Sequence, residues 1–398
     1  MEPEPDVAII GGGPAGLAAA NRAAELGLDV NLFEKQYEIG SPVKTSGGSY
    51  ISDMRKFKIP SKYYNPIRKG IFGTLNNHVE FNYRTDTLCI LDTRSVYQYL
   101  ALRAAEKGCN VHIGTNVREI LLDKNKAVVG VKANKANKEI RLASKIVIDC
   151  SGFASISARK LGLLLAKNAR FGSGVEYEAY VEKIDKRTIM LFVGTDIAPT
   201  GYVWVFPLSD NKARIGIGVT RPDSKVSPLL LLDKLISDRP GIFGDMGKIS
   251  PVELHSGVIP IEPAPSRVTM DGLIIVGDAA GQANPIVGEG IRPAIKFGNL
   301  AAEVSSYAIE KGDVGIRSLQ RYEKEAKRAA NYNSIALKLQ RRMAGYSDKD
   351  WQRAIAILKN LSEKDFLNLL RADFSKSNMF RMFTKVPSLL LKWDRLQA

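Results

Sequence analysis

The sequence of 398 residues predicts an α/β protein, α+β over the whole chain. In it a doubly wound parallel sheet is joined to an antiparallel sheet and a helical C-terminal tail. Three short apolar runs are each followed by a glycine-rich turn, as is typical of central strands in a parallel sheet. Residues 170–260 instead alternate apolar and polar side chains and are rich in β-branched and aromatic residues, which indicates antiparallel strands. From residue 314 onward the chain is largely basic and has helical periodicity.

The first apolar run and its turn are the most informative stretch. Val7–Ile10 has the composition of a strand buried on both faces, and Gly11, Gly13 and Gly16 then form G-x-G-x-x-G before an alanine-rich helix. The first glycine permits a tight turn, and the second lets the backbone approach a pyrophosphate. The third lets the helix pack closely on the strand. This arrangement predicts a dinucleotide site.

The helix that follows begins at Pro14 and Ala15, and its N-terminus offers free N–H groups and a positive dipole end to phosphates. The next strand, residues 29–33, ends in Glu34 and is followed by Lys35. Glu34 lies near the spacing of about 20 residues expected for the acid that binds a ribose hydroxyl. Because a carboxylate would repel a 2′-phosphate, we expect the adenosine of FAD or NAD.

Two later turns identify the dinucleotide. One contains Gly152, after the strand 146–149, and the other contains Gly277 and Asp278, after the strand 273–276. In a doubly wound sheet, the ends of strands from distant parts of the chain meet at one crevice. A carboxylate at Asp278 suits the hydroxyls of a ribityl chain, which NAD lacks. We therefore expect noncovalently bound FAD, with no separate domain for a nicotinamide nucleotide.

Composition limits the other functions. The net charge is +15, which suggests an anionic lipid surface or simply a lysine-rich solvated face, and no aromatic–basic nucleic-acid motif is visible. With no run of about 18 apolar residues and a first strand close to the start, we expect a cytoplasmic protein that binds a membrane at most peripherally. The cysteines and histidines are too scattered for a disulfide framework or a metal site.

The order of the patterns predicts three parts. These are an FAD-binding domain of residues 1–165 and 265–312, a substrate domain of residues 166–264, and a helical region of residues 313–398. Within the first part we expect a functional loop at 36–48, an irregular excursion at 49–90 and a helix at 93–107. Short strands over 111–148 should form a meander that returns to the parallel sheet. A long helix is expected at 290–311.

The three turns in this order resemble the p-hydroxybenzoate-hydroxylase-like flavoproteins, and within that group the geranylgeranyl reductase family. The most specific match is Y-x-W-x-F-P followed by G-x-G. The motifs that carry the resemblance are IGSPVK at 39–44, SGFASISAR at 151–159, PTGYVWVFP at 199–207, GIG at 216–218 and GDAAGQANPIVGEGI at 277–291.

The resemblance implies an FAD-dependent enzyme, with a Rossmann-like cofactor domain, that reduces isoprenoid double bonds of membrane lipids or prenylated quinones. Hydride would pass from flavin N5 to the alkene. By this resemblance Arg94 contacts the FAD phosphates, Asp278 binds ribitol and Pro285–Gly290 lies along the isoalloxazine. The remaining cofactor residues would be Lys44, Thr45, Val117, Gly288 and Ile291. The isoprenoid cavity would be formed by Tyr202, Trp204, Phe206, Pro207, Gly216 and Gly218.

Three residues are candidates for the chemical step. Archaeal lipid reductases carry a cysteine in the loop after P-V-[K/R], where this chain has Thr45 followed by Ser46. A hydroxyl is a much poorer acid than a thiol. Glu289, within the turn at the flavin, is a candidate proton source. Arg292, just beyond it, is expected on a solvated helix face.

Alternatives remain at this point. Flavin monooxygenases and halogenases share the scaffold, and halogenases also have a W-x-W-x-I-P strand. A non-catalytic homologue that binds FAD and lipid is a third alternative. The electron donor, a nicotinamide nucleotide or a redox protein, is not specified by the sequence. The tail at 379–396 mixes aromatic, leucine and basic residues, and would lie on an anionic membrane or dock on its own protein.

Overall fold

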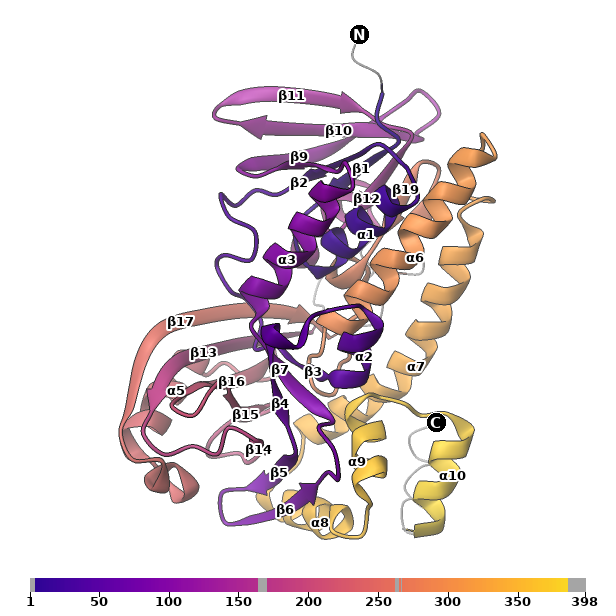
Figure 1. The fold of residues 1–398 in the computed structure, drawn as a ribbon. Coiled ribbons are helices and arrows are strands. Elements are labelled where there is room, and N and C mark those ends of the chain that lie inside the picture. Colours follow the sequence, from indigo (N-terminus) through magenta and orange to yellow (C-terminus); the bar gives the residue numbers. More distant parts are fainter. Residues whose placement is uncertain (1–3, 164–169, 262–264, 266, 386–398) are drawn as a thin grey trace.

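The computed structural model describes residues 4–163, 170–261, 265 and 267–385, and arranges them as two large sheets, two three-stranded sheets and several long helices (Figure 1). The first sheet has the order β18-β19-β12-β1-β2-β8 and is parallel except for the β18–β19 pair. Its strands are β1 (Val7–Ile10), β2 (Val30–Phe33), β8 (Asn110–His112), β12 (Ile146–Asp149), β18 (Thr269–Met270) and β19 (Leu273–Ile275). Because β1, β12 and β19 are neighbours, the three glycine-rich turns that follow them lie at one edge, as predicted.

Three helices pack on this sheet. They are α1 (Pro14–Glu25), α3 (Thr93–Glu106) and α6 (Ile291–Glu310), and α1 contacts both of the others. The alanine-rich face of α1 allows close packing, and a Cβ at Gly298 of α6 would lie 2.4 Å from the Ala15 carbonyl oxygen. The predicted meander is present as β9 (Thr115–Leu122), β10 (Val128–Lys135) and β11 (Lys138–Ala143), which leads into β12.

The second sheet has seven strands in the order β17-β13-β16-β15-β14-β5-β6. Five come from the predicted region: β13 (Phe171–Val181), β14 (Thr188–Phe192), β15 (Tyr202–Pro207), β16 (Lys212–Arg221) and β17 (Ile249–Pro260). Helix α5 (Pro228–Asp238) contacts β13 and β16. The sheet is antiparallel except where β14 pairs with β5.

The expectation of an irregular excursion at residues 49–90 is wrong. This segment contains a short helix, α2 (Ile51–Lys56), and a three-stranded sheet of β3 (Gly48–Tyr50), β4 (Tyr64–Ile67) and β7 (Leu88–Leu91). It also supplies β5 (Lys69–Thr74) and β6 (Asn77–Asn82) to the second sheet. The strands are short and one contains Pro66, so pattern alone did not reveal them; pairing with distant strands stabilises them.

The C-terminal region is helical through residue 385, as expected. It consists of α7 (Gln320–Ala344), α8 (Asp348–Leu358), α9 (Glu363–Leu370) and α10 (Lys376–Lys385). Helix α7 runs beside α6 from the first sheet to the second (Figure 1). The Tyr322 hydroxyl donates to the Ile275 carbonyl of β19 (2.9 Å), and the Gln340 amide donates to the Thr220 hydroxyl of β16 (3.0 Å). Most of the tail predicted at 379–396 falls outside the described residues.

The register of the second sheet places an indole across two strands. Trp204 of β15 is opposite Gly216 of β16, and Tyr202 is opposite Gly218. A Cβ at Gly216 would lie 2.3 Å from the Trp204 ring, whereas one at Gly218 would lie 3.4 Å from it, an ordinary contact. The glycine at 216 is therefore needed because the Trp204 ring occupies the space of a side chain on the next strand.

This register makes a prediction for stability. Gly216→Ala should lower the free energy of unfolding by about 1–3 kcal/mol, because the added methyl overlaps the Trp204 ring. Gly218→Ala is the matched control, since its methyl faces the same ring without overlap, and it should change stability by less than about 1 kcal/mol. Denaturant unfolding of both variants measures this. Equal stability of the two variants would contradict the account.

Candidate active site

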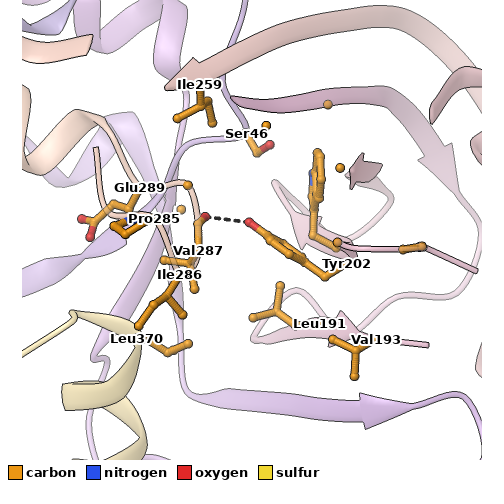
Figure 2. Close-up of a pocket in the computed structure, with 18 of the residues that line it drawn as sticks. Ser46, Leu191, Val193, Tyr202, Ile259, Pro285, Ile286, Val287, Glu289 and Leu370 are labelled. Carbon is orange, nitrogen blue, oxygen red and sulfur yellow. Dashed lines mark hydrogen bonds between the residues drawn. The ribbon is translucent and has the colours of Figure 1, made fainter. Parts of the chain in front are cut away.

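A cavity of about 380 Å³ lies between the second sheet and the C-terminal helices. Its floor is one face of β13, β15, β16 and β17, and one wall is the loop at residues 44–50. The turn at residues 285–291 forms another wall, with Leu370 of α9 beside it (Figure 2), and further side chains of α7, α8 and α9 line the cavity. Apolar side chains predominate, among them Leu191, Val193 and Ile259 (Figure 2).

The dinucleotide crevice lies at the edge of the first sheet. Gly11 has φ +102°, and a Cβ there would lie 2.4 Å from the Cys150 carbonyl oxygen. A Cβ at Gly16 would lie 1.9 Å from the Gly11 oxygen, so strand and helix touch as the fingerprint requires. No atom lies within 4 Å of a Cβ built at Gly13, which leaves open space at the start of α1. No side chain among the described residues caps that helix, so its N–H groups face this space.

Glu34 is positioned at the same crevice by two backbone groups. Its Oε2 atom accepts from the Gly12 N–H (2.7 Å), and its Oε1 atom accepts from the Gln36 N–H (2.8 Å). The carboxylate is thus held beside the G-x-G-x-x-G turn, where a ribose would lie. Val117 is buried in β9. The first residue of this strand, Thr115, donates its N–H to the Glu34 carbonyl oxygen (2.8 Å).

Asp278 lies where the third turn leads toward α6. Its Oδ1 atom is 3.5 Å from a Cβ built at Gly290, the N-cap residue of that helix. Among the described residues its carboxylate makes no hydrogen bond or ion pair, while its carbonyl oxygen accepts from the Gly281 N–H (3.0 Å). Desolvation raises the pKa of the Asp278 carboxyl to about 6. A half-buried carboxylate without a protein partner is what a ligand with hydroxyl groups would satisfy, so the crevice fits the ribityl chain of FAD.

The remaining cofactor residues lie around this crevice with different exposure. Gly152 follows β12 and has φ +66°, and Gly277 follows β19 and has φ +70°. Lys35 and Lys44 are exposed. The exposed Arg94 donates from Nε to Glu38 Oε1 (2.7 Å), so its guanidinium is held by that carboxylate near the start of α3.

The predicted substrate residues gather mainly on one strand. Tyr202, Trp204 and Phe206, at alternate positions of β15, line the cavity together with Gly218. Gly216 does not line it; the Trp204 ring covers it. Pro207 also lies off the cavity wall, at the end of the strand. The Tyr202 hydroxyl donates to the Val287 carbonyl oxygen (2.6 Å), which joins the sheet to the turn at 285–291 (Figure 2).

Thr45 and Ser46 line the cavity from the loop at 44–50. This loop is held from below by the buried Arg214, whose Nη1 donates to the Ser46 carbonyl oxygen and to the Leu91 carbonyl oxygen (both 3.0 Å). Gly257 of β17 lets the loop cross the sheet, since a Cβ there would lie 2.5 Å from the Lys44 oxygen. The backbone of this loop is therefore held against β17 at Gly257 and fixed by the hydrogen bond from Arg214.

The turn at 285–291 contains Pro285, Gly288, Glu289, Gly290 and Ile291, all of which line the cavity. The Glu289 carboxylate is engaged by Arg292 through two hydrogen bonds of 2.8 Å, and it points away from Tyr202 (Figure 2). The expectation that Arg292 lies on a solvated face is wrong, because this pairing and the Tyr50 ring 5.7 Å away hold it half-buried. Both oxygens of the Glu289 carboxylate are therefore held by the Arg292 guanidinium.

Two cavity residues were missed from the sequence. Glu176 and His255 line the floor, buried and hydrogen-bonded to one another between Oε1 and Nδ1 (3.0 Å). Glu176 occurs in a strand of alternating residues, GSGVEYE, where a charged residue on the glycine face was the available signal. His255 carried no motif. The helical wall formed by α7, α8 and α9 was likewise outside every matched motif.

Comparison with known proteins agrees with these features. Residues 6–160 match the model of the FAD dependent oxidoreductase family, and residues 171–259 match that of the geranylgeranyl reductase catalytic domain. A digeranylgeranylglycerophospholipid reductase of Methanothermobacter thermautotrophicus is 33% identical over 97% of both chains. One from Methanocaldococcus jannaschii is 32% identical over 97% of this chain and 96% of the relative.

Solved structures give the same result. A geranylgeranyl bacteriochlorophyll reductase-like protein of Thermoplasma acidophilum superposes with a TM-score of 0.87 at 27% identity, covering 99% of each chain. A flavin-dependent brominase superposes with a TM-score of 0.73 at 19% identity, covering 99% of this chain and 100% of the other, which shows the common fold alone. With its dinucleotide crevice, its aromatic strand and relatives that match along nearly its whole length, the chain belongs to the geranylgeranyl reductase family of FAD-dependent oxidoreductases.

Proposed function

We propose that the protein uses reduced FAD to saturate geranylgeranyl double bonds of membrane lipids. The observation that carries this proposal is the mainly apolar cavity between the aromatic strand β15 and the turn at 285–291. Its volume of about 380 Å³ lies within the usual range for small-molecule sites, about 300–1,000 Å³. An isoprenoid chain has no polar groups to satisfy, and such walls are what it requires.

The bound cofactor would supply hydride for the alkene. The chain's own residues position the two partners and exclude water. The N-terminus of α6 begins at the turn 285–291, so its N–H groups and positive dipole end would stabilise the negative charge of a reduced flavin ring. Tyr202 fixes that turn to the sheet, and the loop with Thr45 and Ser46 would hold the ring from the other side.

This placement assigns different parts of the chain to the cofactor and to the substrate. We propose that residues 1–165 and 265–312 bind FAD, and that residues 166–264 with the helices of 313–398 form the substrate side. The cofactor would be held at the phosphates by the turn at 11–16, with Arg94 and Lys44 nearby. Glu34 would bind the adenosine ribose, and Asp278 the ribitol.

A membrane lipid must be collected from a bilayer. Within the described residues no helix is long and apolar enough to cross a membrane. We propose peripheral contact, supported by the net charge of +15 and by the basic helix α10, on which Phe380 is 70% exposed. The halogenase alternative has only fold similarity in its favour. A lipid-binding protein without turnover is distinguished by experiment.

The test is an anaerobic reaction. FAD-loaded protein is reduced chemically and mixed with a geranylgeranyl glycerophospholipid, and the lipid mass is measured, with an aerobic sample in parallel. We expect a gain of hydrogen pairs without oxygen. An oxygen atom gained only in the aerobic sample would instead establish a monooxygenase. Unchanged lipid in both samples would reject turnover of this substrate.

The desolvated carboxyl of Asp278 makes a second prediction. Its pKa is about 6 in the folded protein, against 3.8 for the unfolded chain, so burial costs stability wherever the group is ionised. The cost is absent below pH 3.8, grows as the pH rises, and is complete above about pH 6. Asp278→Asn should therefore raise the melting temperature of FAD-free protein at about pH 7.5 more than at about pH 4.

The same variant should bind FAD about 10–100-fold more weakly, since hydrogen bonds to a charged group contribute about 1.5–3 kcal/mol. Thermal unfolding at the two pH values and FAD fluorescence titration measure both effects. Asp245→Asn, at an exposed site outside the crevice, is the control and should change neither. A variant that binds FAD like the unmodified protein would remove Asp278 from the proposed site.

A further inference from the structure

The floor of the cavity contains a row of ionisable side chains that the proposed function does not use. In the register of the second sheet, Trp204, Gly216, Glu176 and His255 lie side by side across β15, β16, β13 and β17. Side chains at directly paired positions of neighbouring strands point to the same face of the sheet. Glu176 and His255 line the cavity, and β17 forms the edge of the sheet.

Hydrogen bonds connect this row from the cavity to the surface. The Trp204 Nε1–H donates to Glu176 Oε2 (2.9 Å), and Glu176 Oε1 is 3.0 Å from His255 Nδ1. The other ring nitrogen, Nε2, is 3.0 Å from Glu253 Oε2. The side chains of Glu176 and His255 are 4% and 6% exposed, whereas that of Glu253 is 54% exposed. The chain of contacts therefore begins at buried side chains on the cavity floor and ends in solvent.

The surroundings of His255 favour its protonated form. Both of its nitrogens face carboxylate oxygens, which only accept hydrogen bonds, so both nitrogens carry hydrogen in this arrangement. Burial lowers the pKa of His255, but the hydrogen bonds to Glu176 and Glu253 outweigh it, and the pKa is raised above 6.5. Arg214 is the opposing charge from β16, with Nε 3.8 Å from Glu176 Oε1 and 3.1 Å from Glu178 Oε2. The exposed Lys212 forms an ion pair with Glu178.

Saturating a double bond requires one hydride and one proton. The hydride comes from the reduced cofactor of the proposed function, on which this inference rests. A proton from bulk water would have to enter a mainly apolar cavity. The loop hydroxyls of Thr45 and Ser46 are weak acids, and the Glu289 carboxylate is turned away from Tyr202 (Figure 2). On the cavity floor the Tyr202 hydroxyl donates to the Val287 carbonyl oxygen, which leaves Glu176 and His255 as candidate proton donors.

We propose that Glu253, His255 and Glu176 form a proton relay, in which Glu176 is the acid that protonates the isoprenoid alkene. The imidazolium Nδ1–H passes its proton to Glu176 Oε1, and Glu176 gives a proton to the less substituted alkene carbon, using the electrons of the π bond. The other alkene carbon accepts the hydride, which completes the balance of two electrons and one proton. The neutral His255 ring still carries hydrogen on Nε2. It then rotates so that its bare Nδ1 faces Glu253, where it takes up a proton from solvent, while the Nε2–H faces Glu176.

The test uses FAD-loaded full-length protein in anaerobic single turnovers with a geranylgeranyl glycerophospholipid. Glu176→Gln can still accept from the Trp204 N–H, yet it has no proton to transfer. Its rate of lipid saturation should fall by about 10²–10⁴-fold, the usual contribution of general acid catalysis, while FAD absorbance and lipid affinity stay unchanged. Glu176→Asp should recover part of the rate. His78→Asn, exposed on β6, is the matched histidine control and should retain the full rate.

A second measurement separates a relay from a structural ion pair. The chain has three histidines, so NMR titration of the ring signals, assigned with His255→Asn, gives the pKa of His255 independently of turnover. The single-turnover rate should fall as the pH rises through that pKa. Glu253→Gln should lower the pKa and shift the pH dependence of the rate to lower pH by the same amount.

The outcomes are distinguishable. If unmodified protein saturates the lipid and Glu176→Gln does so within threefold of its rate, the relay is rejected and the proposed function stands. A pH profile that stays in place while the NMR pKa moves would also reject the relay. Failure of the unmodified protein to saturate the lipid would reject the proposed function and the relay together.

Discussion

The structure depends on the packing of one indole across a sheet. The Trp204 ring lies over Gly216, and its edge reaches the glycines of the next row, Gly218 and Gly174, which line the cavity. A side chain at Gly216 would displace the ring, and longer side chains at Gly218 and Gly174 would take up cavity space. The ring also anchors Glu176 through its N–H, so the same contact shapes the cavity and orients its buried carboxylate.

Two segments from outside the second sheet complete the site on that floor. The loop at 44–50 crosses the glycine Gly257 and is tied down by Arg214, and the turn at 285–291 is held by the hydroxyl of Tyr202. Both segments begin at the edge of the parallel sheet, where the dinucleotide crevice lies. The two sheets are thereby coupled, so that a flavin extending from the crevice would meet the cavity.

Sequence reasoning succeeded where the signal is local. The turn at 11–16 and the aromatic strand at 202–207 can each be recognised from a few adjacent residues, and both lie where they were expected. Pairings between distant segments could not be predicted. The row of Glu176 and His255 depends on the register of two strands whose paired residues are 79 positions apart, and β5 joins the second sheet through its pairing with the distant strand β14. The half-buried position of Arg292 depends likewise on its contacts with Glu289 and with Tyr50 on a different part of the chain.

The most direct measurement of the central claim is stopped-flow absorbance of the reduced, FAD-loaded protein mixed with geranylgeranyl lipid in the absence of oxygen. The account predicts that the oxidised flavin spectrum returns at the rate at which double bonds disappear, with one flavin oxidised for each bond. A flavin that stays reduced until oxygen is admitted would contradict it.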